Sequence, residues 1–176
     1  SQSTLVNRIK AYNPHADEKL IVKAFYFAKK AHQEQLRASG EPYFIHPIAV
    51  ANILTDLKLD VPSIITGLLH DTIEDTFVTF ELVEKEFGSE VASLVDGVTK
   101  LNKIALQPED LRRAEDFRKF FLALSEDIRI LLVKIADRLH NLRTLSHVTS
   151  KAKRLNTAHE TLEVYAPLTE RIGIYS

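Results

Sequence analysis

Glycine and proline are scarce in this chain, which holds five Gly and six Pro among 176 residues. That is roughly half of their usual share, and so few turn-forming residues favour long helices over many short elements. Strict alternation of apolar and polar residues is also absent, so little β-structure is expected. The sequence therefore predicts one all-helical domain, large enough to bury a core of its own.

Apolar residues at intervals of three and four predict where the helices lie. Asp17 and Ser89 stand where helix starts need capping side chains, Pro62 suits a first helical turn, and Gly88 suits a helix end. We expect an irregular turn over 73–78 and loops over 36–47 and 102–110. The expected helices span residues 3–12, 18–35, 47–58, 62–72, 80–87, 89–101, 108–125, 127–145 and 151–172.

The composition excludes several classes of protein. Without cysteine, disulfides, thiolate zinc sites and cysteine nucleophiles are all excluded. The net charge of −1 provides no general attraction for nucleic acid. No apolar run reaches the roughly 18 residues of a membrane span, and the N-terminus has no secretory apolar stretch. We therefore expect a cytoplasmic protein that binds neither membranes nor nucleic acid.

Polar residues follow the apolar segment IITGLL, where a central helix is expected. His70 and Asp71 come directly after it, and Glu74 and Asp75 each follow four residues later. If the helix persists, His70 shares a face with Glu74, and Asp71 shares one with Asp75. Carboxylates this close together repel each other unless a cation neutralises them or one takes up a proton. The pattern indicates a metal site, and the alternative is a plain helix-end salt bridge.

A second polar group interrupts the apolar segment ILLVKIADRLHNL. Asp137 lies inside it, and Asn141 and Thr144 follow at spacings that place all three on one ridge of a helix. His140, three residues after Asp137, points about 60° off its direction on a helix, so we expect it to pack or to support a neighbour. His46 stands between an isoleucine and a proline at a loop-to-helix junction, which could hold it rigidly.

Two imidazoles and two carboxylates form a ligand set that suits Mn²⁺, Fe²⁺ or Zn²⁺ better than Cu⁺, Ca²⁺ or Mg²⁺. A metal with an open position lowers the pKa of bound water toward about 7 and supplies hydroxide for hydrolysis. Glu74 and Asp75 would then be spare acids or bases beside it.

At these residues the sequence resembles the HD-superfamily hydrolase domain of the RelA/SpoT homologues, the stringent-response enzymes that make and degrade the alarmone (p)ppGpp. Its GVTKLNKI and DRLHNLRTL stretches look like the long bifunctional branch. The matching segments cover most of the chain in family order: RASGEPYFIHPIAVANIL, LLHDTIEDT, EKEFGSEVASLVDGVTKL, DIRILLVKIADRLHNLRTL and ETLEVYAPLTERIGI.

The resemblance implies that residues 1–176 form a single HD-type helical domain with a metal site between helices. It implies removal of the 3′-pyrophosphate from ppGpp or pppGpp, giving GDP or GTP and pyrophosphate. The implied catalytic pair, which activates or relays protons for the attacking water, is Glu74 and Asp75. The implied ligands of one Mn²⁺ ion are His46, His70, Asp71 and Asp137.

The resemblance also implies a nucleotide pocket. Arg37 and Ser39 match the family's nucleotide-contacting loop, where a guanidinium can stack on guanine. Asn141 and Thr144 match pocket residues near the metal and the ribose. Ala38 departs from members that carry a basic residue there, so one phosphate contact is in doubt.

In the long family members a synthetase domain and regulatory domains follow, and the present sequence lacks the synthetase's nucleotide-binding segments. We therefore expect a piece of a longer enzyme that hydrolyses but does not synthesise. Two alternatives stay open. One is an HD phosphohydrolase acting on another nucleotide, and the other is a non-catalytic module that binds the alarmone for regulation.

Overall fold

The structure, a computed structural model, describes residues 1–104 and 127–144, and these residues form helices and no strand. An isolated bridge between Leu36 and Pro42 closes the loop before the third helix. The predicted all-helical fold is confirmed over this part of the chain. The predicted helices over 108–125 and 151–172 lie outside it. The helices are α1 Gln2–Tyr12, α2 Glu18–Ala31, α3 Ile45–Asp56, α4 Val61–Leu69, α5 Thr72–Asp75, α6 Phe80–Phe87, α7 Ser89–Ile104 and α9 Ile128–Arg143.

Short polar side chains fix where the helices begin, because each accepts a hydrogen bond from a backbone N–H that has no partner inside the helix. Gly88 ends α6 with a φ of 94°, in the left-handed region that glycine adopts without strain. These caps hold each helix to a fixed length. The capping residues are Ser1, Asp17, Asp60, Thr79 and Asp127.

Several helix boundaries differ from the sequence-based expectation. Helix α7 runs on to Ile104, through the first residues of the loop expected over 102–110. The second helix stops at Ala31, because the next residue, His32, leaves the helix and buries its ring against Tyr43. The third starts at Ile45, so the histidine after it lies in the first turn. The fourth stops at Leu69, and α5 forms a separate single turn where an irregular turn was expected.

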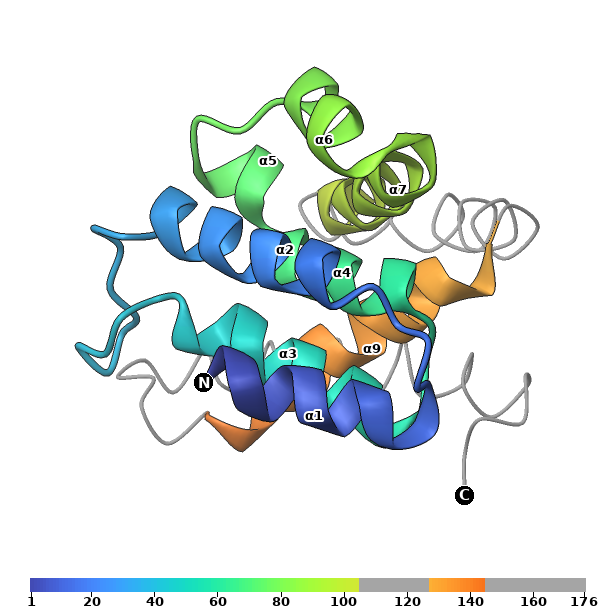
Figure 1. The fold of residues 1–176 in the computed structure, drawn as a ribbon. Coiled ribbons are helices and arrows are strands. Elements are labelled where there is room, and N and C mark those ends of the chain that lie inside the picture. The colour runs from blue at the N-terminus through green and yellow to red at the C-terminus, as the bar shows by residue number, and fades with distance from the viewer. Residues whose placement is uncertain (105–126, 145–176) are drawn as a thin grey trace.

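Helix α4 lies at the centre of the molecule. Figure 1 shows α2 in front of it, α3 below it, α6 and α7 above it and α9 behind it, and α4 contacts α2, α3, α7 and α9. Its residues Ile64, Ile65, Leu68 and Leu69 are all fully buried. Burying one such side chain contributes roughly 1.5–3 kcal/mol, so this helix anchors the core. Among the described residues, no helix is both long and apolar enough to cross a membrane.

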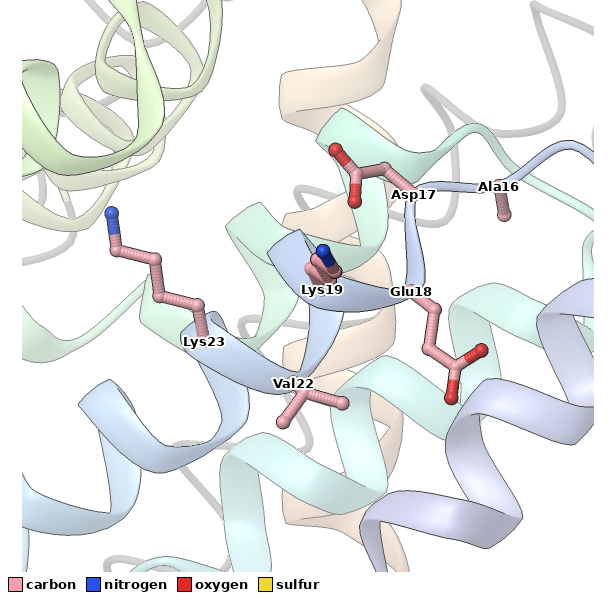
Figure 2. Close-up of a pocket in the computed structure, with 6 residues that line it drawn as sticks. All are labelled: Ala16, Asp17, Glu18, Lys19, Val22 and Lys23. Carbon is pink, nitrogen blue, oxygen red and sulfur yellow. The ribbon is translucent and has the colours of Figure 1, made fainter.

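An open surface hollow of about 740 Å³ lies at the start of α2 (Figure 2). Its charged side chains, Asp17, Glu18, Lys19 and Lys23, are exposed to solvent. It lies at the opposite end of α2 from His32. The hollow is therefore separate from the buried polar side chains around which the rest of the structure is arranged.

Two helices approach closely at Gly97 of α7. A Cβ atom at this position would lie 2.3 Å from Cδ1 and 2.9 Å from Cγ1 of Ile130 in α9. Ile130 is itself buried, so its side chain has little room to move. The absence of a side chain at Gly97 therefore sets the spacing between α7 and α9, and α9 carries one of the residues of the functional site.

We expect Gly97→Ala to destabilise the protein by about 1–3 kcal/mol, because overpacking outweighs the better helix propensity of alanine. Urea denaturation measures the free energy of unfolding. The matched control is Ile130→Ala, alone and combined with Gly97→Ala. Once the isoleucine is shortened, the added methyl group should cost nothing further, whereas equal effects of Gly97→Ala in both backgrounds would rule out this contact as the cause.

Candidate metal centre

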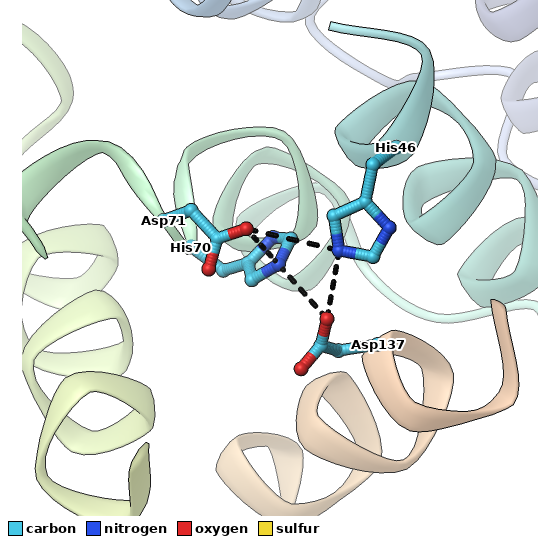
Figure 3. Close-up of side chains that lie close together, drawn as sticks. All are labelled: His46, His70, Asp71 and Asp137. Atoms are coloured by element: carbon cyan, nitrogen blue, oxygen red, sulfur yellow. Dashed lines mark hydrogen bonds and ion pairs between the residues drawn. The ribbon is translucent and has the colours of Figure 1, made fainter. Parts of the chain in front are cut away.

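Four side chains from three parts of the chain meet in one place (Figure 3). His46 comes from the first turn of α3, His70 and Asp71 from the junction between α4 and α5, and Asp137 from α9. One nitrogen or oxygen atom from each lies within 4.8 Å of all the others. The sequence-based expectation that these residues converge on one spot is therefore met by their geometry.

The end of α4 places two of these side chains. Nδ1 of His70 lies 2.7 Å from the carbonyl oxygen of Gly67 and donates to it, which ties the ring to the last turn of α4. The hydroxyl of Thr72 donates to the carbonyl of Leu69 at 2.7 Å and satisfies another helix-end acceptor. The backbone then turns, and Asp71 becomes the residue that precedes α5. The helix does not run on as a single rod.

The proton on His70 is fixed by this arrangement. A neutral ring that donates from Nδ1 has only a lone pair at Nε2. Nε2 is fully buried, has no hydrogen-bond partner among the described residues, and lies 3.0 Å from Oδ2 of Asp71 and 3.4 Å from Oδ1 of Asp137. A buried lone pair facing two carboxylate oxygens requires positive charge between them, either a cation or a proton.

The pKa values of the cluster show the same demand for positive charge. Burial alone lowers the pKa of His70, but Asp71 and Asp137 outweigh it and raise this pKa well above its ordinary value. Burial alone raises the pKa of Asp71, but the neighbouring His70 brings it down to about 2. A cation at this position would replace the proton on His70, so binding would release that proton.

The donor set fits a divalent transition metal. It offers two imidazole nitrogens and two carboxylate oxygens from largely buried side chains, with Nε2 of His46 2.7 Å from Oδ1 of Asp137 and 3.7 Å from Oδ2 of Asp71. Atoms that bind one such ion at about 2.0–2.2 Å lie roughly 3–4.4 Å from each other, so small shifts complete the site. Mixed nitrogen and oxygen ligands suit this class of ion.

His140 contacts the other face of His46. The two Nδ1 atoms lie 2.7 Å apart, so one of them donates and the other accepts. If Nε2 of His46 binds a cation, its proton must sit on Nδ1, and Nδ1 of His140 must then accept. Burial, followed by the charges of His46 and Arg37, lowers the pKa of His140 to about 4, which keeps its ring neutral. The predicted supporting role of His140 thus becomes a specific contact.

Each aspartate accepts a hydrogen bond from a side chain outside the four-residue cluster. The phenol of Tyr43 donates to Oδ2 of Asp71 at 2.5 Å, and burial, followed by the charge of Asp71, raises the pKa of Tyr43 so that it stays protonated. The ammonium of Lys134 donates to Oδ2 of Asp137 at 2.9 Å, which leaves Oδ1 facing the imidazoles. Lys134 is buried with it. Both carboxylates are therefore fixed in orientation.

Glu74 and Asp75 lie on α5, next to the cluster but bonded elsewhere. The carboxylate of Glu74 accepts from the side chain of Asn102 at 2.6 Å, and the carbonyl of Asp75 accepts from Gln35 at 2.6 Å. Partial burial is the largest cause that raises the pKa of both carboxyls, and the charge of Asp71 adds to it. Each of these two acids can therefore exchange a proton closer to neutral pH than an exposed carboxyl.

The residues expected to contact a nucleotide are only partly brought together. Nη2 of Arg37 donates to the hydroxyl of Thr144 at 3.2 Å, while its Nη1 is buried without a partner among the described residues. Asn141 lies 3.4 Å from Oδ1 of Asp137, on the ridge expected from the sequence. Ser39 instead bonds Glu41 within its own loop, at 3.3 Å. The loop thus reaches the end of α9 through Arg37.

Three supporting residues escaped the sequence analysis. Lys134 carried a usable signal, because a lysine in an apolar run three residues before Asp137 needs a buried acid as its partner. For Tyr43 and Asn102 the sequence holds no comparable signal, since their partners are remote along the chain. The ring of His32 packs against Tyr43, and its Nδ1 lies 2.8 Å from the amide oxygen of Gln35.

Comparison with known proteins identifies the family that this chain matches. The sequence model described as "HD domain" matches residues 24–175. A Myxococcus xanthus protein named GTP pyrophosphokinase is 54% identical over 169 residues, which is 94% of this chain and 22% of that protein. The Escherichia coli (strain K12) bifunctional (p)ppGpp synthase/hydrolase SpoT is 47% identical over 167 residues, which is 95% of this chain and 24% of SpoT.

A solved structure resembles the fold as well. It is described as a metazoan ortholog of SpoT that hydrolyses ppGpp, with a TM-score of 0.62 and 28% identity. The similarity covers 84% of this chain and 88% of that one. In contrast, this chain spans only 22–24% of the length of the curated relatives that it matches.

We expect His140→Phe to weaken divalent-ion binding by about 10–100-fold, because it removes the acceptor that holds the proton on Nδ1 of His46. Calorimetric titration of the purified protein with Mn²⁺, Zn²⁺ and Mg²⁺ measures this affinity. His140→Asn is the matched control, because its amide can still accept near the position of Nδ1, and it should bind close to wild type. Equal affinities in the Phe and Asn variants would show that the contact does not orient His46.

Proposed function

The chain belongs to the HD-domain family, and we propose that it removes the 3′-pyrophosphate from ppGpp and pppGpp in a reaction that depends on Mn²⁺. The products are GDP or GTP and pyrophosphate. The observation that carries this proposal is the buried Nε2 of His70, which faces two carboxylates and needs positive charge between them, a need that a divalent cation would meet. The relatives named for (p)ppGpp hydrolysis favour this substrate over others.

The proposed ligands of the ion are His46, His70, Asp71 and Asp137. When bound, a divalent cation provides a Lewis acid that makes water more acidic and neutralises charge on a phosphate. Mn²⁺ suits a set of two imidazoles and two carboxylates, being intermediate between the oxygen preference of Mg²⁺ and the sulfur tolerance of Zn²⁺. The chain's own side chains then have to orient the substrate and to handle protons.

Proton handling falls to Glu74 and Asp75. Their carboxyl pKa values are raised by partial burial and by nearby acids, which brings each group closer to the range in which a general base works well. Ionised, either carboxylate can accept a proton from the attacking water. The proton is later needed by the nucleotide's 3′-oxygen, when the bond from that oxygen to phosphorus breaks.

Substrate binding falls to the loop over 37–40 and the end of α9. The guanidinium of Arg37, held by Thr144, has a buried N–H without a partner among the described residues and can offer it to the nucleotide. Its planar face can stack on guanine. Ser39 and Asn141 are the further proposed contacts. A substrate with several phosphate charges therefore meets local positive charge despite the chain's net charge of −1.

Two other functions remain as alternatives to be tested. The same site could hydrolyse a different phosphorylated nucleotide, since the HD family is defined by its fold and ligands. It could also bind the alarmone without turnover, as a regulatory module of a longer protein. The relatives named pyrophosphokinase are about four times as long as this chain, and we propose that any synthetase activity belongs to their other segments.

We expect the purified chain with Mn²⁺ to release pyrophosphate from ppGpp and not from dNTPs or NADPH. Asp71→Ala should abolish both Mn²⁺ binding and this release, because it removes a ligand and an essential charge. Chromatographic product analysis and calorimetry provide the two measurements. Asp96→Ala, a change at a partly exposed aspartate of α7 that pairs with Lys100 and lies outside the proposed site, is the matched control and should behave as wild type.

The outcomes separate the alternatives. Release from dNTPs or NADPH at a comparable rate would indicate a different nucleotide substrate. Tight ppGpp binding without turnover would indicate a regulatory module. Mn²⁺-dependent hydrolysis that persists in Asp71→Ala would show that the proposed ligand set is wrong.

Glu74→Gln is expected to lower kcat by about 10²–10⁴-fold with little change in Mn²⁺ affinity, because it removes a base that is not a ligand. In the wild type, kcat should fall as the pH drops through the raised pKa of Glu74, since the protonated acid cannot accept a proton. This acid limb should be lost in the variant. Glu84→Gln, at an exposed position of α6, is the control, and Asp75→Asn measured in parallel shows which of the two acids has the larger effect.

A further inference from the structure

Asn102, near the end of α7, bridges an acid outside the ligand set to a residue that holds a ligand. Its Nδ2 donates to Oε1 of Glu74 at 2.6 Å, and its Oδ1 accepts from the ammonium of Lys134. Lys134 in turn donates to Oδ2 of Asp137 at 2.9 Å. One line of hydrogen bonds therefore runs from α5 through α7 to α9.

The chemistry of the partners fixes the orientation of this amide. An ammonium group can only donate, and an ionised carboxylate can only accept. The carbonyl end of Asn102 must therefore face Lys134 and its NH₂ end must face Glu74. The reversed amide would set oxygen against carboxylate and nitrogen against ammonium, so only one arrangement satisfies both neighbours.

Glu74 needs such a partner because its own helix gives it little support. Helix α5 is only four residues long. The side chain lies at an exposed position, and the charged groups acting on it are Asp71 and Asp75 on its own side and Lys134 from α9. Two of these three groups are acids, and their negative charge repels the carboxylate of Glu74. A donor on the facing helix opposes that repulsion and gives the side chain one position.

We propose that Asn102 is a positioning residue for hydrolysis: it holds the carboxylate of Glu74 at a fixed place relative to the metal ligand Asp137, acting through Lys134. This inference rests on the proposed function, in which Glu74 handles a proton during the release of pyrophosphate. Asn102 itself binds neither the metal nor the substrate. Its loss should therefore slow turnover and leave both binding steps nearly intact.

The experiment compares Asn102→Ala and Asn102→Asp with the wild type in Mn²⁺-dependent ppGpp hydrolysis. Asn102→Asp keeps an oxygen for Lys134 but replaces the donor to Glu74 with a carboxylate that repels it. We expect kcat to fall by about 10–100-fold in both variants, with KM and Mn²⁺ affinity close to wild type. Asn7→Ala and Asn7→Asp, at an exposed position of α1, are the matched controls and should leave kcat unchanged.

A double-mutant cycle tests whether Asn102 acts through Glu74. In the Glu74→Gln background, Asn102→Ala should have almost no further effect on kcat, because the group that it positions is already gone. A full additional loss there would assign Asn102 a merely structural role. An unchanged kcat in Asn102→Ala, in a wild type that hydrolyses ppGpp, would overturn the inference and leave the proposed function standing.

A measurement without substrate keeps the two proposals separate. The hydrogen bond from Asn102 favours the ionised form of Glu74, so its removal should raise the pKa of that carboxyl. Carbon NMR of selectively labelled glutamate follows this titration in Asn102→Ala and in wild type. An upward shift supports the positioning role even if the chain does not hydrolyse ppGpp, and an unshifted Glu74 contradicts it.

Discussion

Two largely buried carboxylates that face two imidazoles and demand positive charge are the constraint around which this structure is built. Negative charge in a buried place is costly, and the cost is reduced only by positive charge at close range. Three features support this arrangement. The break after α4 places His70 and Asp71, the phenol of Tyr43 donates to Asp71, and the ammonium of Lys134 donates to Asp137. The apolar helices around it exclude water, which strengthens every one of these interactions.

The elements most visible in the sequence were those set by local chemistry. Capping residues and apolar spacing predicted the all-helical fold, and polar residues in apolar runs indicated a metal site. The full set of His46, His70, Asp71 and Asp137 came from the resemblance to a known family, and the structure brings these four together. The spacing rule that paired His70 with Glu74 assumed an unbroken helix. A helix continues in this way only if no side chain competes for the carbonyl groups at its end. His70 and Thr72 do compete, and the chain turns there.

Contacts between remote segments could not be predicted in this way. The pairing of His46 with His140 depends on how α3 and α9 pack, and that packing follows from many apolar contacts rather than from either residue. The same holds for Asn102, whose partners lie 28 and 32 positions away along the chain. Its neighbours in sequence give no hint that its amide is used.

The four proposed ligand residues come from α3, the junction of α4 and α5, and α9, so a bound ion would tie distant parts of the fold together. The unfolded chain offers no equivalent partner for such an ion. An ion bound there would stabilise the folded state by mass action, by about 2.7 kcal/mol when its concentration is 100 times its dissociation constant. If the proposed site binds metal, the resistance of this domain to heat should therefore vary with the supply of that metal in its surroundings.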